Sequence, residues 1–337
     1  MLSQRAAMLG GIGPMTFNAA RYVLSGIMLL IAAPMLPQTT KVKIDKTLTA
    51  GGKPRSSSDE IVEAGLLPLL EVVDMAEHSP LSENATMWIF GLTLGLLNFI
   101  ASTSQQIGLQ YTSAGKCAFI TGFDIVFVPV VGLMIPHLTS DAPPKLTTWV
   151  SVCISVLGLY LISSSDVDGG SSPIGMGEVF IFVGTIFWTF HIVVTDIATN
   201  HVDSISLTLV QFLGTSVLCV FSSFLFESGE WSMAHIFRSW EVILLLGVCE
   251  CLGFTLAAMG QTHAPPSHAV IIMSFEAVFT AIVGYIFLHE TLSSREFFGC
   301  FLMVTSFICI RWDMQLCDFL SRCTHKVFSR SLVAERV

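Results

Sequence analysis

The amino-acid sequence predicts an all-α membrane protein, a bundle of helices that crosses a lipid bilayer many times. Hydrophobic residues make up 53% of the 337 residues and charged residues only 12%, whereas a soluble domain carries about 25% charged residues. The chain also contains a series of apolar runs long enough to cross a bilayer core, which takes about 20 residues as a helix. Finally, its second half repeats its first. These observations exclude a soluble fold and a disordered chain.

Nine segments are expected to span the membrane. The links between several of them are short, for example 107–112 and 262–267, so neighbouring spans should run antiparallel. The nine expected spans are 16–36, 87–106, 113–135, 146–164, 175–197, 204–226, 241–261, 268–288 and 297–312.

The basic residues predict the orientation in the membrane. Eleven Lys and Arg residues fall on the side that holds the first loop and the C-terminal end, and four fall on the other side. The first loop and the C-terminus are therefore expected to be cytosolic.

The expected organisation has five parts. Residues 1–36 hold a remnant of the start of the first repeat and the first visible span, and residues 37–86 form an inserted cytosolic loop. Residues 87–165 complete the first repeat, residues 174–313 form the second repeat, and residues 314–337 are a cytosolic tail.

The internal repeat is visible when the chain is shifted against itself. A shift of 152 residues places 123–127 over 275–279, and a shift of 190 places 16–36 over 206–226. The matched pairs include Asp124 with Glu276, Asn98 with Glu250, His137 with His289 and, at the larger shift, Arg21 with Gln211.

The repeat predicts two units of nominally five helices each. The span 175–197 has no counterpart in the first half, so the first helix is expected to be absent and about nine spans remain. Because five is an odd number, the two units should be inverted in the membrane. Inverted repeats are typical of transporters, whose substrate site lies between the repeats near the midplane.

Three stretches resemble a known family. They are Gly108 to Gly122 followed by Val126-Phe127-Val128-Pro129, then Met273 to Phe279 with Leu288-His289-Glu290-Thr291-Leu292, and Pro14 to Phe17 leading to Arg21. In this order they resemble the EamA-type transporters of the drug/metabolite transporter superfamily, over about residues 8–311. The resemblance implies ten helices in two inverted five-helix repeats and secondary transport of small solutes, such as amino acids or other metabolites, without ATP or a metal.

The chain departs from that family's pattern in two places. The opening helix with its usual Trp-Gly element is missing, and Trp188 of the second repeat is the nearest equivalent. Asp124 stands where the family usually has an aromatic residue.

Five ionisable residues lie in apolar segments: Arg21, Lys116, Asp124, Glu250 and Glu276. A charge at the bilayer centre costs about 2.5–3.5 kcal/mol on an insertion scale, so each should line a wet cavity, pair with another group or be neutral.

Lys116 and His268 occupy equivalent places at the starts of related spans, where a helix N-terminus could bind an anionic group of a substrate. The alternative is that Lys116 extends to the lipid headgroups.

Asp124 and Glu276 occur at equivalent positions further along those spans. Two carboxylates that approach each other do not both ionise easily, so one could carry a proton and couple transport to a proton gradient. The alternative is that each acid pairs locally, for example with Arg21 or Lys116.

Arg21 could bind a substrate carboxylate or bridge helices to an acid, and Glu250 is expected to hydrogen-bond across helices. Asn98 and Gln211 could add polar groups to a solute site. Trp188 could stack on the solute, although an aromatic residue in a span usually serves packing.

The sequence therefore predicts a secondary transporter for a small polar metabolite of the amino acid or organic anion class, working by alternating access. Its expected partners are the solute, the bilayer and protons as a coupling ion, and a homodimer stays open. A net charge of −9 argues against nucleic acid. No cofactor, metal or catalytic residue is expected. The alternatives are a non-transporting or truncated scaffold or receptor and, as a minor one, a membrane-embedded hydrolase. The sequence has neither the HExxH motif nor the nucleophile elbow that hydrolases of two common classes carry.

Overall fold

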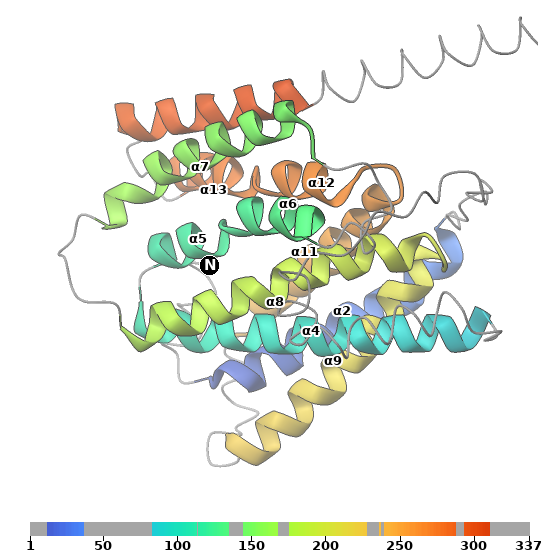
Figure 1. The fold of residues 1–337 in the computed structure, drawn as a ribbon. Helices are drawn as coiled ribbons and strands as arrows, with labels where there is room; N and C mark the ends of the chain where they lie inside the picture. Colours follow the sequence, from blue (N-terminus) through green and yellow to red (C-terminus); the bar gives the residue numbers. More distant parts are fainter. Residues whose placement is uncertain are drawn as a thin grey trace, which may run out of the picture.

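The computed structural model describes residues 12–36, 83–112, 114–134, 144–167, 175–227, 236, 239–287 and 293–310, and all of the regular structure in these ranges is helical (Figure 1). The helices are α2 (Pro14–Ala32), η1 (Ala33–Met35), α4 (Glu83–Tyr111), α5 (Ala114–Thr121), α6 (Asp124–Met134), α7 (Leu146–Val167), α8 (Met176–Thr199), α9 (Ser204–Phe226), α11 (Trp240–Gln261), α12 (Pro266–Met273) and α13 (Glu276–Phe287). Residues 294–310 are also helical.

Seven helical stretches in the described part of the chain are long and apolar enough to cross a membrane. They correspond to the first seven expected spans, and one of them, Lys116–Met134, is built from α5 and α6 together. In the region of the eighth expected span, Pro266–Phe279 is a shorter apolar stretch. The protein is an integral, multi-pass membrane protein. Residues 37–82 of the expected loop and the C-terminal tail lie outside the described residues, whereas residues 83–86, expected to belong to the loop, are the start of α4.

Two of the expected spans are interrupted, and they break at equivalent places. α5 gives way to α6 at residues 122–123, and α12 gives way to α13 at residues 274–275, which is the same position after the shift of 152. The backbone turns are also equivalent, because Phe123 N donates to Ile120 O at 3.1 Å and Phe275 N donates to Ile272 O at 3.2 Å. Such tightened turns inside a helix commonly mark hinges.

Local signals start several helices. Pro14 is in the first turn of α2, where the missing N–H costs nothing. Asp203 caps α9, since its carboxylate accepts a hydrogen bond from Ser206 N at 2.9 Å. In the first turn of α8, Glu178 accepts from Gly175 N at 3.0 Å, so its negative charge lies near the positive end of the helix.

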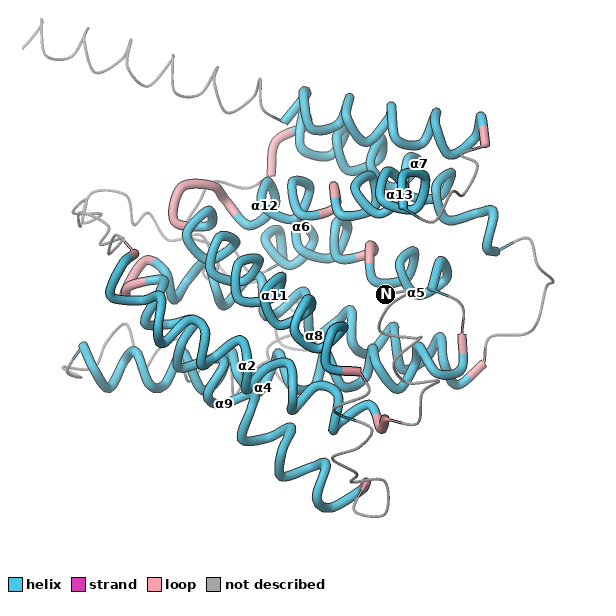
Figure 2. Tube along the Cα trace, turned by 180° about the vertical axis from the view of Figure 1, so that it is seen from behind, coloured by secondary structure: helices cyan, strands magenta, loops and turns pink. Residues whose placement is uncertain are grey.

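The helices pack at close range where glycines face a neighbour. α4 lies along α8 and α9, and α6 packs against α12 (Figures 1 and 2). A Cβ atom added at Gly95 of α4 would lie 3.0 Å from Gln211 O of α9, and one added at Gly184 of α8 would lie 2.9 Å from Ala101 O of α4. Small residues at these points let the helix backbones approach, as is common in membrane proteins.

The helices that carry most of the polar side chains form one part of the bundle. α2 packs against α9, α4 and α11, so these four helices share an interior. The interrupted helices and α7 pack beside them, around a core that includes Ile125, Val128, Val270 and Ile271.

Candidate functional site

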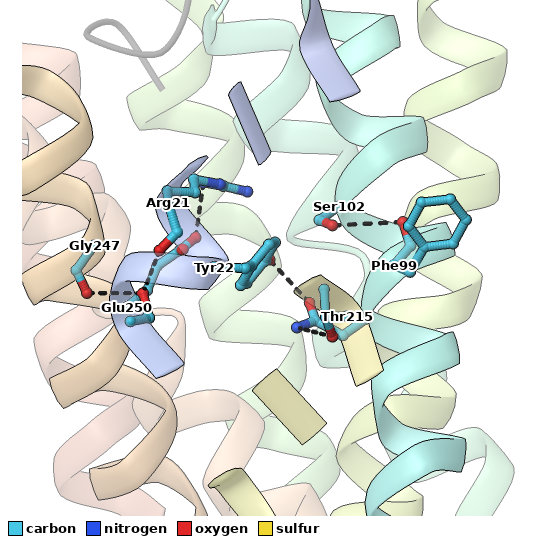
Figure 3. Close-up of polar contacts among 9 residues, drawn as sticks. Arg21, Tyr22, Phe99, Ser102, Thr215, Gly247 and Glu250 are labelled. Carbon is cyan, nitrogen blue, oxygen red and sulfur yellow. Dashed lines mark hydrogen bonds and ion pairs between the residues drawn. The ribbon is translucent and has the colours of Figure 1, made fainter. Parts of the chain in front are cut away.

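A buried ion pair joins α2 to α11. Arg21 Nη1 lies 2.7 Å from Glu250 Oε1, and the two side chains are only 4% and 15% exposed (Figure 3). The guanidinium group also lies over the Tyr22 ring, 4.9 Å from its centroid. Because a lone charge is costly in such surroundings, each partner stabilises the ionised form of the other.

A chain of hydrogen bonds continues from Tyr22 into α4 and α9 (Figure 3). Tyr22 Oη donates to Asn98 Oδ1 at 3.0 Å, and Asn98 Nδ2 donates to Thr215 Oγ1 at 3.2 Å. The Thr215 hydroxyl donates to Gly95 O at 3.1 Å. These bonds fix the Asn98 amide in one orientation between three helices.

Aromatic rings extend from the ion pair towards Trp188. Tyr22 contacts Phe212, whose ring lies 5.6 Å from that of Phe254. Phe254 in turn contacts His191 at 5.7 Å and Trp188 at 5.9 Å. We call Tyr22, Phe212, Phe254 and Trp188 the aromatic strip. It joins α2, α9, α11 and α8 beside the polar groups.

Several polar atoms on α2, α4, α8, α9 and α11 are buried without a hydrogen-bond partner in the described part of the chain. They are Arg21 Nε, Glu250 Oε2, both amide atoms of Asn18 and of Gln106, His191 Nε2 and Gln211 Nε2. His191 and Gln211 are neighbours across the α8–α9 interface. Buried polar atoms normally have partners, so this set, which includes both donors and acceptors, can bind water or a polar solute.

Four of the residues expected from the sequence to form a site come together here. They are, on α2, α4, α8 and α9 in turn, Arg21, Asn98, Trp188 and Gln211. The ion pair, the hydrogen bonds of Asn98 and the aromatic strip link these helices to one another and to α11. We call Arg21, Asn98, His191, Gln211 and Glu250 the central polar site, since each lies well inside its helix.

The other four expected residues lie on the interrupted helices. Lys116, near the start of α5, is 3.6 Å from Glu178 Oε1 of α8. His268 lies in the first turn of α12.

Asp124 and Glu276 are the first residues of α6 and α13 and lie within electrostatic reach of each other. Asp124 is partly buried, whereas Glu276 is exposed. In the described part of the chain, Arg21 pairs with Glu250 and Lys116 with Glu178 rather than with either of these acids.

Sequence reasoning missed Glu227. Its carboxylate lies at the start of α2 and accepts hydrogen bonds from Met15 N at 2.8 Å, Thr16 N at 2.7 Å and Thr16 Oγ1 at 2.7 Å. Glu227 directly follows α9, so it caps a helix that is more than 200 residues away in the sequence. Sequence reasoning also missed Phe254, because nothing in the sequence distinguishes it from the other apolar residues of its span. In the described ranges, no three His, Cys, Asp or Glu side chains lie close enough together to hold a metal ion.

Comparisons with known proteins identify the same family that the motifs at residues 108–129 and 273–292 resemble. The family model described as the EamA-like transporter family matches residues 64–164 and again residues 175–312. An uncharacterized transporter of Archaeoglobus fulgidus is 24% identical over 233 residues, covering 66% of this chain and 69% of its own. The uncharacterized transporter YvbV of Bacillus subtilis is 25% identical over 251 residues, covering 73% of this chain and 78% of its own.

A protein of known crystal structure has the same overall fold. It aligns with 92% of this chain and 97% of its own, with a TM-score of 0.62 and 12% sequence identity. At that identity the likeness concerns the fold alone.

Proposed function

We propose that this chain, which belongs to the EamA-like transporter family, carries a small polar metabolite of the amino acid or organic anion class across a membrane by alternating access. The family places it among membrane transporters. The nature of the solute is our inference, and it rests on the central polar site.

The observation that carries the proposal is the set of buried, unpartnered polar atoms on the helices that pack around the Arg21–Glu250 pair. A buried polar group without a hydrogen bond costs free energy, from about 1 kcal/mol upward. A solute with both donors and acceptors would supply the missing partners. Arg21 offers an unpartnered Nε–H to an anionic group, and His191 and Gln211 offer further polar contacts.

The aromatic strip supports a solute that also has an apolar part. Trp188 and Phe254 lie beside His191, so an aliphatic or aromatic portion of the solute could pack on their rings while its polar end meets the central polar site. Such a mixture of a few polar groups with aromatic walls is typical of small-molecule sites.

Alternating access is supported by the two interrupted helices. Because they break at equivalent positions of the two repeats, we infer that each acts as a hinge and that the repeats are inverted in the membrane. Asp124 and Glu276, which directly follow the two breaks, are the groups we propose for proton coupling.

A ligand screen followed by transport measurement tests the solute assignment. Purified protein is heated in the presence of single amino acids and organic anions, and a ligand that binds the native state raises the melting temperature. The same compound should then enter proteoliposomes that contain the protein. The Gln211→Ala variant should lose the ligand-induced shift, whereas Val217→Ala, on the exposed face of α9, should keep it. If no compound of either class shifts the protein or is transported, the proposal is wrong.

Proton coupling has its own test. Uptake driven by an imposed pH gradient is compared in the unaltered protein and in the Asp124→Asn and Glu276→Gln variants. Loss of gradient-driven uptake with retained exchange of solute supports coupling through that carboxyl group. Gradient-driven uptake that persists in both variants rules it out.

A further inference from the structure

Two helices that the repeat relates, α2 and α9, begin in the same way. The shift of 190 residues that places α2 over α9 also places Gly13 over Asp203 and Thr16 over Ser206. Gly13 and Asp203 both precede their helix in extended backbone, with φ and ψ of −67° and 150° at Gly13 and of −64° and 131° at Asp203. Each of the two residues therefore has the backbone conformation of an N-cap.

The two helices take their capping carboxylate from different places. For α9 it is local, since Asp203 Oδ2 accepts from Ser206 N at 2.9 Å and from Ser206 Oγ at 3.0 Å. The equivalent groups of α2, Thr16 N and Thr16 Oγ1, both donate to Glu227 Oε2 at 2.7 Å. Gly13 has no side chain, and a Cβ atom added there would overlap the Glu227 carboxyl group. The end of α9 thus supplies the acceptor that a local residue would otherwise provide to α2.

The contact continues along both helices from this point (Figure 1). Glu227, Ser223 and Cys219 follow one another at spacings of four residues, so they lie on one side of α9. Ser223 Oγ is 2.5 Å from Thr16 Oγ1. Cys219 is fully buried and packs in the same apolar cluster as Ala19 of α2. We therefore expect the Cys219 thiol to become accessible when the start of α2 and the end of α9 part.

We propose that Glu227 is a latch between the two repeats, which holds the start of α2 against the end of α9 and releases it when this end of the bundle opens. The inference rests on the alternating access of the proposed function. A helix with its own cap, as α9 has in Asp203, keeps the acceptor of its first N–H groups when a neighbour moves away. α2 loses its acceptor, because the acceptor belongs to α9. Opening at this end and uncapping of α2 are therefore one event, opposed by charge-assisted hydrogen bonds.

The native cysteines provide a reporter that needs no solute. Protein in lipid nanodiscs, accessible from both faces, is treated with a water-soluble sulfonated maleimide, and mass spectrometry of its peptides gives the labelling rate of each thiol. Cys219 and Cys117 are both fully buried. Cys117 lies on α5 and packs with Leu109 and Ile181, away from the latch. Release of the latch should raise the labelling rate of Cys219 and leave that of Cys117 unchanged.

Moving the cap to residue 13 separates the two roles of Glu227. In the double variant Gly13→Asp, Glu227→Ala the new carboxylate stands at the N-cap of α2, in space that the glutamate has left, and should cap α2 as Asp203 caps α9. This variant should melt near the temperature of the unaltered protein. Its Cys219 should nevertheless be labelled about tenfold faster, because local opening no longer breaks bonds between the helices. If Cys219 returns to the rate of the unaltered protein, Glu227 is only a cap and the latch is refuted.

Asp203→Ala is the matched control, since it removes the equivalent carboxylate at the other end of α9. It should lower the melting temperature, as Glu227→Ala does, while the labelling of Cys219 stays slow. Fast labelling of Cys219 in this control would also refute the latch, because any lost cap would then loosen the bundle.

The two single variants decide the matter if the double variant does not regain its melting temperature. Glu227→Ala and Asp203→Ala are then compared the same number of degrees below their own melting temperatures, and only Glu227→Ala should expose Cys219. Because the labelling needs no solute, a negative result here leaves the proposed function standing, and a failed ligand screen leaves this test unaffected.

Discussion

Arg21 of α2 and Glu250 of α11 form a buried ion pair with 2.7 Å between Nη1 and Oε1. The pair joins the first visible span to a helix of the second repeat. Ser25, one turn further along α2, strengthens the same junction because its hydroxyl donates to Gly247 O of α11 at 2.9 Å.

Removing one member of the ion pair should destabilise the protein more than removing both. Arg21→Met leaves the Glu250 carboxylate buried and unpaired, at a cost of about 3–5 kcal/mol. In the double variant Arg21→Met, Glu250→Leu the uncompensated charge is gone, so most of the loss should be recovered. Melting temperatures of the purified variants in detergent measure this. A double variant less stable than either single variant would contradict the prediction.

Removing one hydrogen bond of Asn98 should destabilise the protein less than removing the whole Asn98 amide. Tyr22→Phe removes the donor to Asn98 Oδ1 and should cost about 1–2 kcal/mol. Asn98→Ala should cost more, since it leaves the Tyr22 hydroxyl without its acceptor and also removes the donor to Thr215 Oγ1. Thermal unfolding of the two variants compares them. Equal losses would indicate that water replaces the amide in the Asn98→Ala protein.

Two helix glycines, Gly184 of α8 and Gly253 of α11, should tolerate the same substitution very differently. Gly184→Val places a side chain against the backbone of α4, 2.9 Å from Ala101 O, and overpacking of this kind costs about 1–3 kcal/mol or more. Gly253→Val points into open space and should leave the melting temperature within a degree or two of the starting value. The yield of monodisperse protein in size-exclusion chromatography provides a second readout. Similar behaviour of both variants would show that the α4–α8 contact is looser than the structure has it.

Glu227 should hold the start of α2 in place. Glu227→Ala leaves Met15 N, Thr16 N and the Thr16 hydroxyl without their acceptor, and loss of such a charged cap should cost about 1–3 kcal/mol. Hydrogen exchange at the Met15 and Thr16 amides should accelerate, while amides in the middle of α9 serve as the internal control. Unchanged exchange at these two amides would mean that α2 finds another cap.

Much of the fold could be predicted from hydropathy, because a chain in a bilayer must satisfy its backbone hydrogen bonds within helices. The repeat also placed Asp124 and Glu276 at equivalent positions. The sequence predicts continuous spans over 113–135 and 268–288, whereas the structure interrupts both of them before these acids. Pro129 lies inside α6, whereas Gly122, which lacks a Cβ atom and weakens a helix, lies at the break.

The site was predictable only in part. Arg21, Asn98, Trp188 and Gln211 stand out as polar or aromatic residues in apolar segments, and they do come close together. Which acid pairs with Arg21 depends on the packing of α2 against α11, and no local pattern encodes it. The same is true of Glu227, whose role exists only once the end of α9 meets the start of α2.

The hydrogen bonds of Glu227 tie the start of α2 to the end of α9 at one end of the bundle. At one face, α2 and α9 cannot part unless water reaches the Met15 and Thr16 amides and the Glu227 carboxylate as the helices separate. Parting α2 from α9 at the Glu227 end therefore carries a cost of hydrating charged and amide groups that the separation of two purely apolar helix surfaces would not.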